Sequence, residues 1–250
     1  MEKNNNKNKS NKKDNKEKVI KTEKKEIDKD KVKVILSIQN ASYRYGDAAE
    51  DEYALRDVSY DFEKGKIYAI RGRSGTGKTT LLSLISGLER CTEGTILFDG
   101  KNLKDINLDT YRNSQIGIVF QSYNLLPYMT ASENIILSMD ASGRKIENKK
   151  QKAIELMESV GLKSSYADRK VLRLSGGEQQ RVAIARSLSY NPKMIVADEP
   201  TGNLDKQTEA EILDIFKKLA HEEDKCVIIV THSPNVCDVV DEIYDLKKVK

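Results

Sequence analysis

Short apolar runs separated by polar and amphipathic stretches follow one another from Val34 to the C-terminal region. Runs of this length, rich in β-branched residues, indicate strands that are buried on both faces. We expect such strands at residues 34–38, 66–70, 95–98, 116–120, 194–197 and 226–230. The stretch 53–62 is expected to form further antiparallel strands, with an acidic turn at 46–51 before it and a turn at Asp99 and Gly100 after the third run.

Between the strands, apolar residues recur at intervals of three and four, which is typical of helices that pack through one face. The first such set is Leu81, Leu84, Ile85 and Leu88. Further helices are expected at residues 131–139, 147–160, 176–190 and 206–222. Buried strands that alternate with helices predict an α/β protein with a parallel sheet covered on both faces.

Charge is unevenly distributed along the 250 residues. Residues 1–33 hold 13 Lys and 7 acidic residues, whereas the remainder holds 30 Lys and Arg and 32 acidic residues. The first segment cannot bury enough apolar surface to offset chain entropy, so we expect a solvated, disordered tail. A polybasic segment that contacts an anionic membrane is the alternative. The rest of the chain lacks the basic excess of a dedicated nucleic-acid-binding protein.

The cysteines and the apolar runs indicate a cellular compartment. Cys91, Cys226 and Cys237 lie far apart and lack metal-ligand spacing, so free thiols in a reducing cytosol are expected. The apolar runs are far shorter than the ~20 residues that span a bilayer, and the N-terminus lacks the apolar core of a signal peptide. We therefore expect a protein that is made and kept inside the cell.

A glycine-rich segment between a predicted strand and a predicted helix has the pattern G-x-x-x-x-G-K-[ST]. Its residues are Gly72, Arg73, Ser74, Gly75, Thr76, Gly77, Lys78, Thr79 and Thr80. Glycines let backbone N–H groups turn inward around phosphates, and the helix N-terminus adds partial positive charge. In such a loop Lys78 reaches the β- and γ-phosphates and the Thr79 hydroxyl ligates Mg²⁺. A chance match is the alternative, but the flanking strand and helix favour a nucleoside-triphosphate site.

Two other places carry candidate chemistry. An apolar strand ends in Asp198 and Glu199, where the first acid can hold the water shell of Mg²⁺ and the second can polarise the attacking water. Acids often end strands in α/β proteins, so this pair indicates a site only because a phosphate loop is also present.

A helix is expected to begin after Ser175, a suitable N-cap, and Gly176 and Gly177 allow an anion to approach closely. From the residues alone, a capped helix without a ligand is an equal alternative.

Taken together, these residues resemble the ATP-binding cassette family of ATPases. The stretch from Ser175 to Gln179 is similar to the signature motif of that family, which other phosphate-loop proteins lack. Four further positions match in the family's order, namely the adenine-stacking aromatic Tyr45, the Q-loop Gln121, the D-loop Asp205 and the switch His232. For Tyr45, core packing next to Tyr43 is the alternative. The resemblance covers residues 34 to about 246.

Residues 121–134 and 197–205 are similar to one branch of the family, which serves lipoprotein release, macrolide export, antimicrobial-peptide resistance and cell division. Arg73 departs from the family pattern, which more commonly has a small residue or proline there. The tail of residues 1–33 is not part of the pattern either.

The resemblance implies an α/β fold with a phosphate-loop (P-loop) NTPase core, an antiparallel β-subdomain and a helical subdomain at about 122–175, within a nucleotide-binding domain of residues 34–250. It assigns catalysis to Lys78, Gln121, Glu199 and His232. It assigns Mg²⁺ to Thr79, Gln121 and Asp198. It assigns ATP to Tyr45 and the phosphate loop, and, from the second subunit of a head-to-tail homodimer, to Ser175, Gly176, Gly177, Glu178 and Asp205.

The resemblance also implies a partner and a place in the cell. The chain would hydrolyse ATP at the inner face of the cell membrane and power a separate transmembrane permease, an exporter or extractor of peptides, lipoproteins or drugs. We expect the segment 122–139 to contact that permease, with Tyr128 and Met129 facing it and Leu125 and Leu126 packed inside. A non-transport switch that signals through a membrane partner, as in cell division, is the alternative function.

Overall fold

A computed structural model of the chain describes residues 34–46 and 52–249. The tail predicted for residues 1–33 and most of the acidic turn predicted at 46–51 lie outside the described residues. Of the two units into which the chain divides, the second, Ile35–Lys250, contains both sheets apart from Val34.

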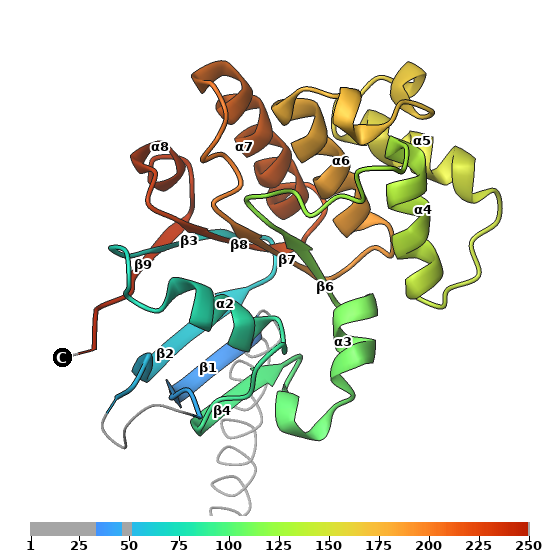
Figure 1. Cartoon of the computed structure of the whole chain (residues 1–250). Coiled ribbons are helices and arrows are strands. Elements are labelled where there is room, and N and C mark those ends of the chain that lie inside the picture. Colours follow the sequence, from blue (N-terminus) through green and yellow to red (C-terminus); the bar gives the residue numbers. More distant parts are fainter. Residues whose placement is uncertain (1–33, 47–51, 250) are drawn as a thin grey trace, which may run out of the picture. The chain divides into compact units, whose positions relative to one another are not determined.

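A parallel sheet with the strand order β6-β7-β8-β3-β9 forms the centre of the second unit (Figure 1). Its strands are β3 (Ile67–Arg71), β6 (Ile116–Val119), β7 (Met194–Asp198), β8 (Cys226–Thr231) and β9 (Glu242–Asp245). The residues of β8 are all buried, as the near-continuous apolar run predicts. The edge strand β9 escapes sequence-based prediction because its alternate residues are exposed and it lacks an apolar run.

Alternate residues of the sheet face two different cores. Ile67 and Ala69 contact the core that is completed by four helices, whereas Tyr68 and Ile70 contact the core on the other face. The four helices are α4 (Ala131–Ala141), α5 (Lys149–Ser159), α6 (Gly176–Leu188) and α7 (Lys206–His221). The opposite face is covered by α2 (Lys78–Ile85), α3 (Leu108–Ser114) and an antiparallel sheet (Figure 1). A short helix, α8 (Pro234–Cys237), follows β8.

The antiparallel sheet has the order β2-β1-β4-β5. Its strands are β1 (Val34–Tyr43), β2 (Leu55–Glu63), β4 (Glu93–Phe98) and β5 (Lys101–Asn102). The turn between β4 and β5 contains Asp99 and Gly100, both with positive φ, as their residue types predict. The predicted α/β fold with an antiparallel subdomain is therefore confirmed.

The predicted helices are present with ends shifted by a few residues. Two helices among the described residues were missed, namely α3 and the four-residue α8. The helix α3 is short and polar, buries only Tyr111, and begins at an Asn107 cap, so it offers no apolar stripe. In the helical region, α6 packs into the same core as α4 and α5, so the helices form one layer that extends beyond residue 175. None of the helices within residues 34–46 and 52–249 is both long and apolar enough to cross a membrane.

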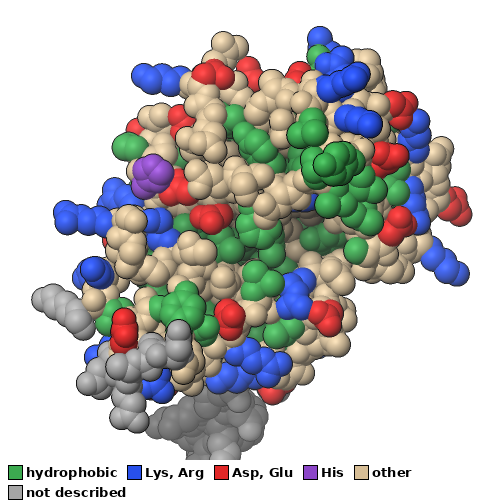
Figure 2. Space-filling model, viewed as in Figure 1, with side chains coloured by type: hydrophobic (Ala, Val, Ile, Leu, Met, Phe, Trp, Pro, Cys, Tyr) green, Lys and Arg blue, Asp and Glu red, His purple; other side chains and the backbone are tan. Residues whose placement is uncertain are grey.

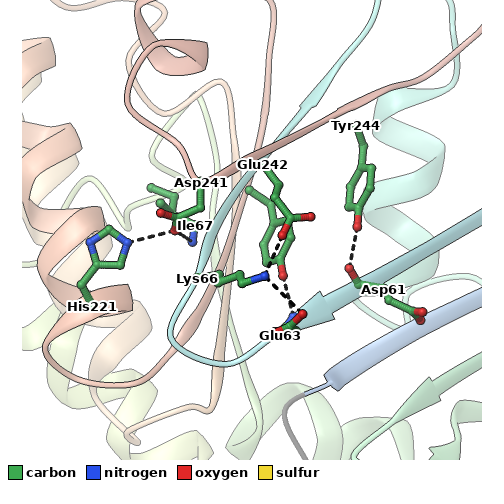
Figure 3. A network of polar contacts seen from close by, with 9 residues as sticks. Asp61, Glu63, Lys66, Ile67, His221, Asp241, Glu242 and Tyr244 are labelled. Atoms are coloured by element: carbon green, nitrogen blue, oxygen red, sulfur yellow. Dashed lines mark hydrogen bonds and ion pairs between the residues drawn. The ribbon is translucent and has the colours of Figure 1, made fainter. Parts of the chain in front are cut away.

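Polar contacts fasten the edge strand β9 at the end of the sheet where β3 begins (Figure 3). Lys66 Nζ lies 2.7 Å from Oε1 of Glu242, and Oδ2 of Asp241 accepts the backbone N–H of Ile67 at 2.8 Å. The same Asp241 oxygen lies 2.9 Å from Nε2 of His221 at the end of α7. The side chain of His221 is half-exposed, as its place at the end of a helix suggests, and Asp241 is its partner.

Candidate nucleotide site

The parallel register brings three segments to one edge of the sheet. The last residue of β3 pairs with Thr231 and the last residue of β7 pairs with Val230. The segments that follow, namely the phosphate loop, Glu199 and His232, therefore leave the sheet at the same level. The carboxyl edge of adjacent parallel strands is where open α/β sheets bind ligands.

The phosphate loop closes around the ammonium group of Lys78. Lys78 Nζ donates to the backbone oxygen of Gly72 at 2.8 Å and to that of Arg73 at 3.3 Å. The hydroxyl of Thr76 donates to the same Arg73 oxygen at 2.9 Å. The lysine charge is thus held inside the curve of the loop, where it can neutralise phosphate oxygens.

Two glycines of the loop are required by close contacts. Gly77 has φ of 91°, and a Cβ there would lie 2.5 Å from the backbone oxygen of Ala54 and 2.7 Å from Cδ2 of Leu55. A Cβ at Gly72 would lie 2.5 Å from Oγ1 of Thr76. Side chains at either position would therefore displace the loop from β2 or deform its turn.

Basic side chains surround the loop on one side. A cavity of about 790 Å³ opens there, and its lining has four basic side chains, among them Arg73, Lys247 and Lys248, beside His232 and a single acid, Asp245. A cleft with an excess of one sign of charge concentrates ions of the opposite sign. The cavity therefore suits an anionic ligand, and Arg73 adds a charge where the family more commonly has none.

Tyr45 and Tyr43 have separate roles. Tyr43 is buried in the core, whereas Tyr45 is half-exposed and its hydroxyl lies 3.0 Å from Oγ1 of Thr80 on α2. The two rings meet edge to face at a centroid distance of 5.1 Å. Core packing thus accounts for Tyr43, and Tyr45 offers an accessible ring beside the phosphate loop.

Glu199 is held by two residues that follow one another at the end of β8. Its Oε1 lies 2.6 Å from Nδ1 of His232, and its Oε2 accepts the hydroxyl of Thr231 at 3.0 Å. The side chain of Glu199 is 11% exposed, whereas that of His232 is 72% exposed. Glu199 also has a positive φ of 43°, a strained conformation that occurs preferentially at functional sites. Thr231 was missed from the sequence, although a polar residue that ends an apolar strand just before His232 was an available signal.

Asp198 lies one residue before Glu199 and is half-buried. Burial, and then the charge of Glu199, raise the pKa of Asp198, while Lys78 opposes this shift. A cation next to this carboxyl group would favour its ionised form. The oxygen donors of Thr79, Asp198 and Gln121 suit Mg²⁺. In the described part of the chain, no group of three or more His, Cys, Asp and Glu side chains could hold a metal.

Gln121 lies two residues after Val119, the last residue of β6, and is exposed. A Cβ added at Gly202 would lie 3.2 Å from Nε2 of Gln121 and 3.8 Å from Cβ of Glu199. The structure therefore places the predicted Q-loop residue next to the segment that carries Glu199.

The signature segment lies elsewhere. Ser175 caps α6, and its hydroxyl accepts the N–H of Glu178 at 3.3 Å, while Oε2 of Glu178 accepts the N–H of Ser175 at 2.7 Å. Ser175 and Gly176 are exposed, and a Cβ at Gly177 would lie 2.5 Å from Cγ2 of Thr208 on α7. Among the described residues no hydrogen bond joins this segment to the phosphate loop, which begins α2 on the opposite face of the sheet.

Asp205 has a clear structural role as the N-cap of α7. Its Oδ1 accepts the N–H groups of Gln207 and Thr208 at 3.1 Å, and its Oδ2 accepts the Thr208 hydroxyl at 2.6 Å. The Thr208 side chain first, and then these backbone groups, lower the pKa of Asp205. Nucleotide contact by Asp205 or Glu178 stays a prediction, because the geometry of one chain explains both through helix capping.

The fold and the edge site define a phosphate-loop nucleotide-binding domain. The profile of the ABC transporter family matches residues 55–202. The uncharacterized ABC transporter ATP-binding protein YclH of Bacillus subtilis is 48% identical over 207 residues, which are 83% of this chain and 91% of YclH. The lipoprotein-releasing system ATP-binding protein LolD of Francisella tularensis is 38% identical over 217 residues, which are 85% of this chain and 94% of LolD.

A solved structure of the ATP-binding cassette MJ0796, from Methanocaldococcus jannaschii, is also similar. It shows a dimeric post-hydrolysis state bound to ADP and Pi, and it superposes with a TM-score of 0.78 at 38% identity, over 85% of this chain and 94% of that one. The chain belongs to the ABC transporter family and is an ATPase domain of it. The resemblance inferred from the sequence, including its branch, is confirmed.

Proposed function

We propose that this chain is the ATP-hydrolysing subunit of an ABC transporter, that two copies act together, and that they power a separate membrane permease for peptides, lipoproteins or drugs. The observation that carries the proposal is the meeting of the phosphate loop, Glu199 and His232 at one edge of the parallel sheet. The names of YclH and LolD as ATP-binding proteins of transport systems support it.

Each residue of the edge has a distinct task in hydrolysis. Lys78 and the N–H groups of the phosphate loop bind and neutralise the phosphates. Glu199 orients and polarises the attacking water, and His232 holds Glu199 while its exposed ring steadies the γ-phosphate. Thr79, Asp198 and Gln121 would hold Mg²⁺, which neutralises charge that develops on the phosphate oxygens. Tyr45 stacks on the adenine.

A second copy completes the site. Ser175 and Gly176 are exposed at the N-terminus of α6, on the other face of the sheet from the phosphate loop of the same chain. One chain therefore cannot bring its own signature segment to its own ATP. In a head-to-tail pair, the N–H groups of Gly176 and Gly177 and the Ser175 hydroxyl bind the γ-phosphate held by the partner. The dimeric state of the MJ0796 structure supports such a pair.

An exposed apolar patch is the proposed contact with the permease. Tyr128 is 83% exposed and Leu172 is 65% exposed. Their segments run side by side, because the N–H of Val171 donates to the backbone oxygen of Met129 and residues 130 and 170 form a β-bridge. Figure 2 shows hydrophobic side chains gathered over this helical part of the molecule. A patch of this kind marks an interaction site.

The expected packing of this segment is partly correct. Leu125 packs against the helical core as predicted, and Tyr128 faces outward. Leu126 was expected inside but is exposed. The chain turns around Pro127 there, and the backbone N–H of Leu126 donates to the side-chain oxygen of Asn134. Leu126 therefore joins Tyr128 and Leu172 in the exposed apolar patch.

Arg186 connects the patch segment to the signature helix. Its guanidinium donates to the backbone oxygens of Tyr123 at 2.9 Å and Asn124 at 2.5 Å, and burial lowers the pKa of Arg186. Both acceptors have positive φ and follow Gln121. Movement of Gln121 with the state of the nucleotide would therefore reach both α6 and the permease contact.

The proposal is tested by purifying the full chain from its own cell with the membrane solubilised in detergent. We expect Mg²⁺-dependent release of phosphate from ATP and co-purification of one protein with several membrane spans. Loss of ATP binding in Lys78→Ala is the control for the site. A chain that hydrolyses ATP while its membrane partner carries no cargo would instead support the non-transport switch, and a chain without ATP hydrolysis contradicts the proposal.

A further inference from the structure

Glu209 is a buried acidic residue in the first turn of α7, and its carboxyl group joins two loops of the nucleotide site. It is 9% exposed. Its Oε1 accepts the hydroxyls of Thr201 and Ser233, both at 3.1 Å, and its Oε2 accepts the side-chain amide of Asn235 at 2.8 Å. All three partners are donors, so one side chain satisfies polar groups from two separate segments.

The partners of Glu209 flank the residues that act on ATP. Thr201 is two residues after Glu199, and Ser233 directly follows His232. The N–H of Ser233 donates at 2.9 Å to the Thr231 hydroxyl, which donates to Glu199. A chain of hydrogen bonds therefore runs from Glu209 to the carboxyl group of Glu199, and a second contact, through Thr201, holds the segment after Glu199.

We propose that Glu209 is a positioning residue for ATP hydrolysis, which fixes the loop of Glu199 relative to the loop of His232. This inference rests on the proposed function of the chain as an ATPase. Glu209 does not reach the phosphate loop with any contact in the described residues, so it acts through Thr201 and Ser233. A displacement of about 1 Å at a reacting group can lower a rate by about 10²-fold, so a cross-link between these loops bears directly on turnover.

A purely structural role is the competing explanation, because a buried acceptor in the first turn also stabilises α7. The two roles differ in what they predict for kinetics. A positioning role lowers kcat and leaves ATP affinity alone, since Lys78 and the phosphate loop have no contact with Glu209. A structural role lowers thermal stability without a specific effect on kcat in the folded protein.

The test compares Glu209→Ala, Glu209→Gln and the control Asp214→Ala in the full chain. Asp214 is an exposed acid on the same helix that pairs with Lys217 at 3.6 Å. We expect Glu209→Ala to lower kcat by roughly 10- to 100-fold with ATP affinity within about 2-fold of wild type. Glu209→Gln should recover most of kcat, because its amide oxygen still accepts both hydroxyls. Asp214→Ala should behave as wild type.

Two results would overturn the inference. The first is a folded Glu209→Ala protein with kcat within about 2-fold of wild type. The second result concerns Thr201→Val, the variant to use if Glu209→Ala does not fold, because it removes one donor and leaves Glu209 in place. We expect Thr201→Val to lower kcat several-fold, and an unchanged kcat counts against the inference. If the wild-type chain itself does not hydrolyse ATP, both the proposed function and this inference are wrong. If the wild-type chain hydrolyses ATP, the results for the variants test the inference alone.

Discussion

The imidazole of His232 and the carboxyl group of Glu199 form a hydrogen bond of 2.6 Å between the ends of the neighbouring strands β8 and β7. The contact orients an acidic side chain that can polarise water at the edge of the sheet where the phosphate loop lies. His232 is mostly exposed, so its ring can hold Glu199 and still contact a ligand.

Glu199→Gln keeps the size of the side chain and removes its capacity as a base. We expect steady-state ATP hydrolysis to fall by about 10²-fold or more, the typical contribution of a general base, while ATP binding persists. Phosphate release and equilibrium nucleotide binding measure the two effects. Glu155→Gln, an exposed residue of α5 that pairs with Lys152 at 3.1 Å, is the matched control and should keep wild-type activity. Wild-type turnover by Glu199→Gln would remove Glu199 from catalysis.

Gly77→Ala should be far more damaging than Gly100→Ala, although both glycines have positive φ. At Gly100 a Cβ meets nothing within 4 Å, so only the strained backbone conformation lowers the free energy of unfolding, by about 1–2 kcal/mol. At Gly77 the added carbon would meet a backbone oxygen at 2.5 Å, so we expect a larger loss in the free energy of unfolding and loss of ATP binding. Denaturant titration and nucleotide binding provide the comparison. Equal losses of stability in the two variants would show that the contact with β2 is unimportant.

Tyr128→Ser combined with Leu172→Ser should leave ATP binding and thermal stability unchanged, because both side chains are exposed. Association with the membrane protein that co-purifies with the chain, and any ATPase stimulation by it, should fall together. Leu88→Ser, which replaces an exposed leucine just beyond α2, is the control and should keep both. If the double variant still binds its partner with full stimulation, the exposed apolar patch is not the contact.

The extent of prediction from the sequence follows from the kind of signal each element carries. The buried strands β3, β7 and β8 are apolar runs, so their positions and the parallel sheet were accessible. The edge strand β9 and the short helix α3 carry no such pattern, because each buries few side chains. Their places depend on tertiary contacts such as that between Asp241 and Ile67.

Some residues of the candidate site could likewise be predicted from the sequence and others could not. Lys78, Glu199 and His232 follow predicted strands, so their meeting at one edge could be expected from the parallel register. Glu209 gave no signal, since an acid in the first turn of a helix is ordinary, and its partners at 201, 233 and 235 come together only in the fold. The exposure of Leu126 likewise depends on the turn before α4 rather than on its residue type.

The sharing of ATP between two copies is the central claim, and light scattering of Glu199→Gln protein tests it most directly. With ATP and Mg²⁺ bound but turned over slowly, we expect twice the mass of one chain, and the mass of one chain with ADP. Adding Ser175→Arg to this variant should abolish the dimer while ATP still binds, because the exposed signature segment would no longer fit the partner's γ-phosphate. A monomer that binds ATP with full affinity in Glu199→Gln, or a dimer that persists with Ser175→Arg, would contradict the account.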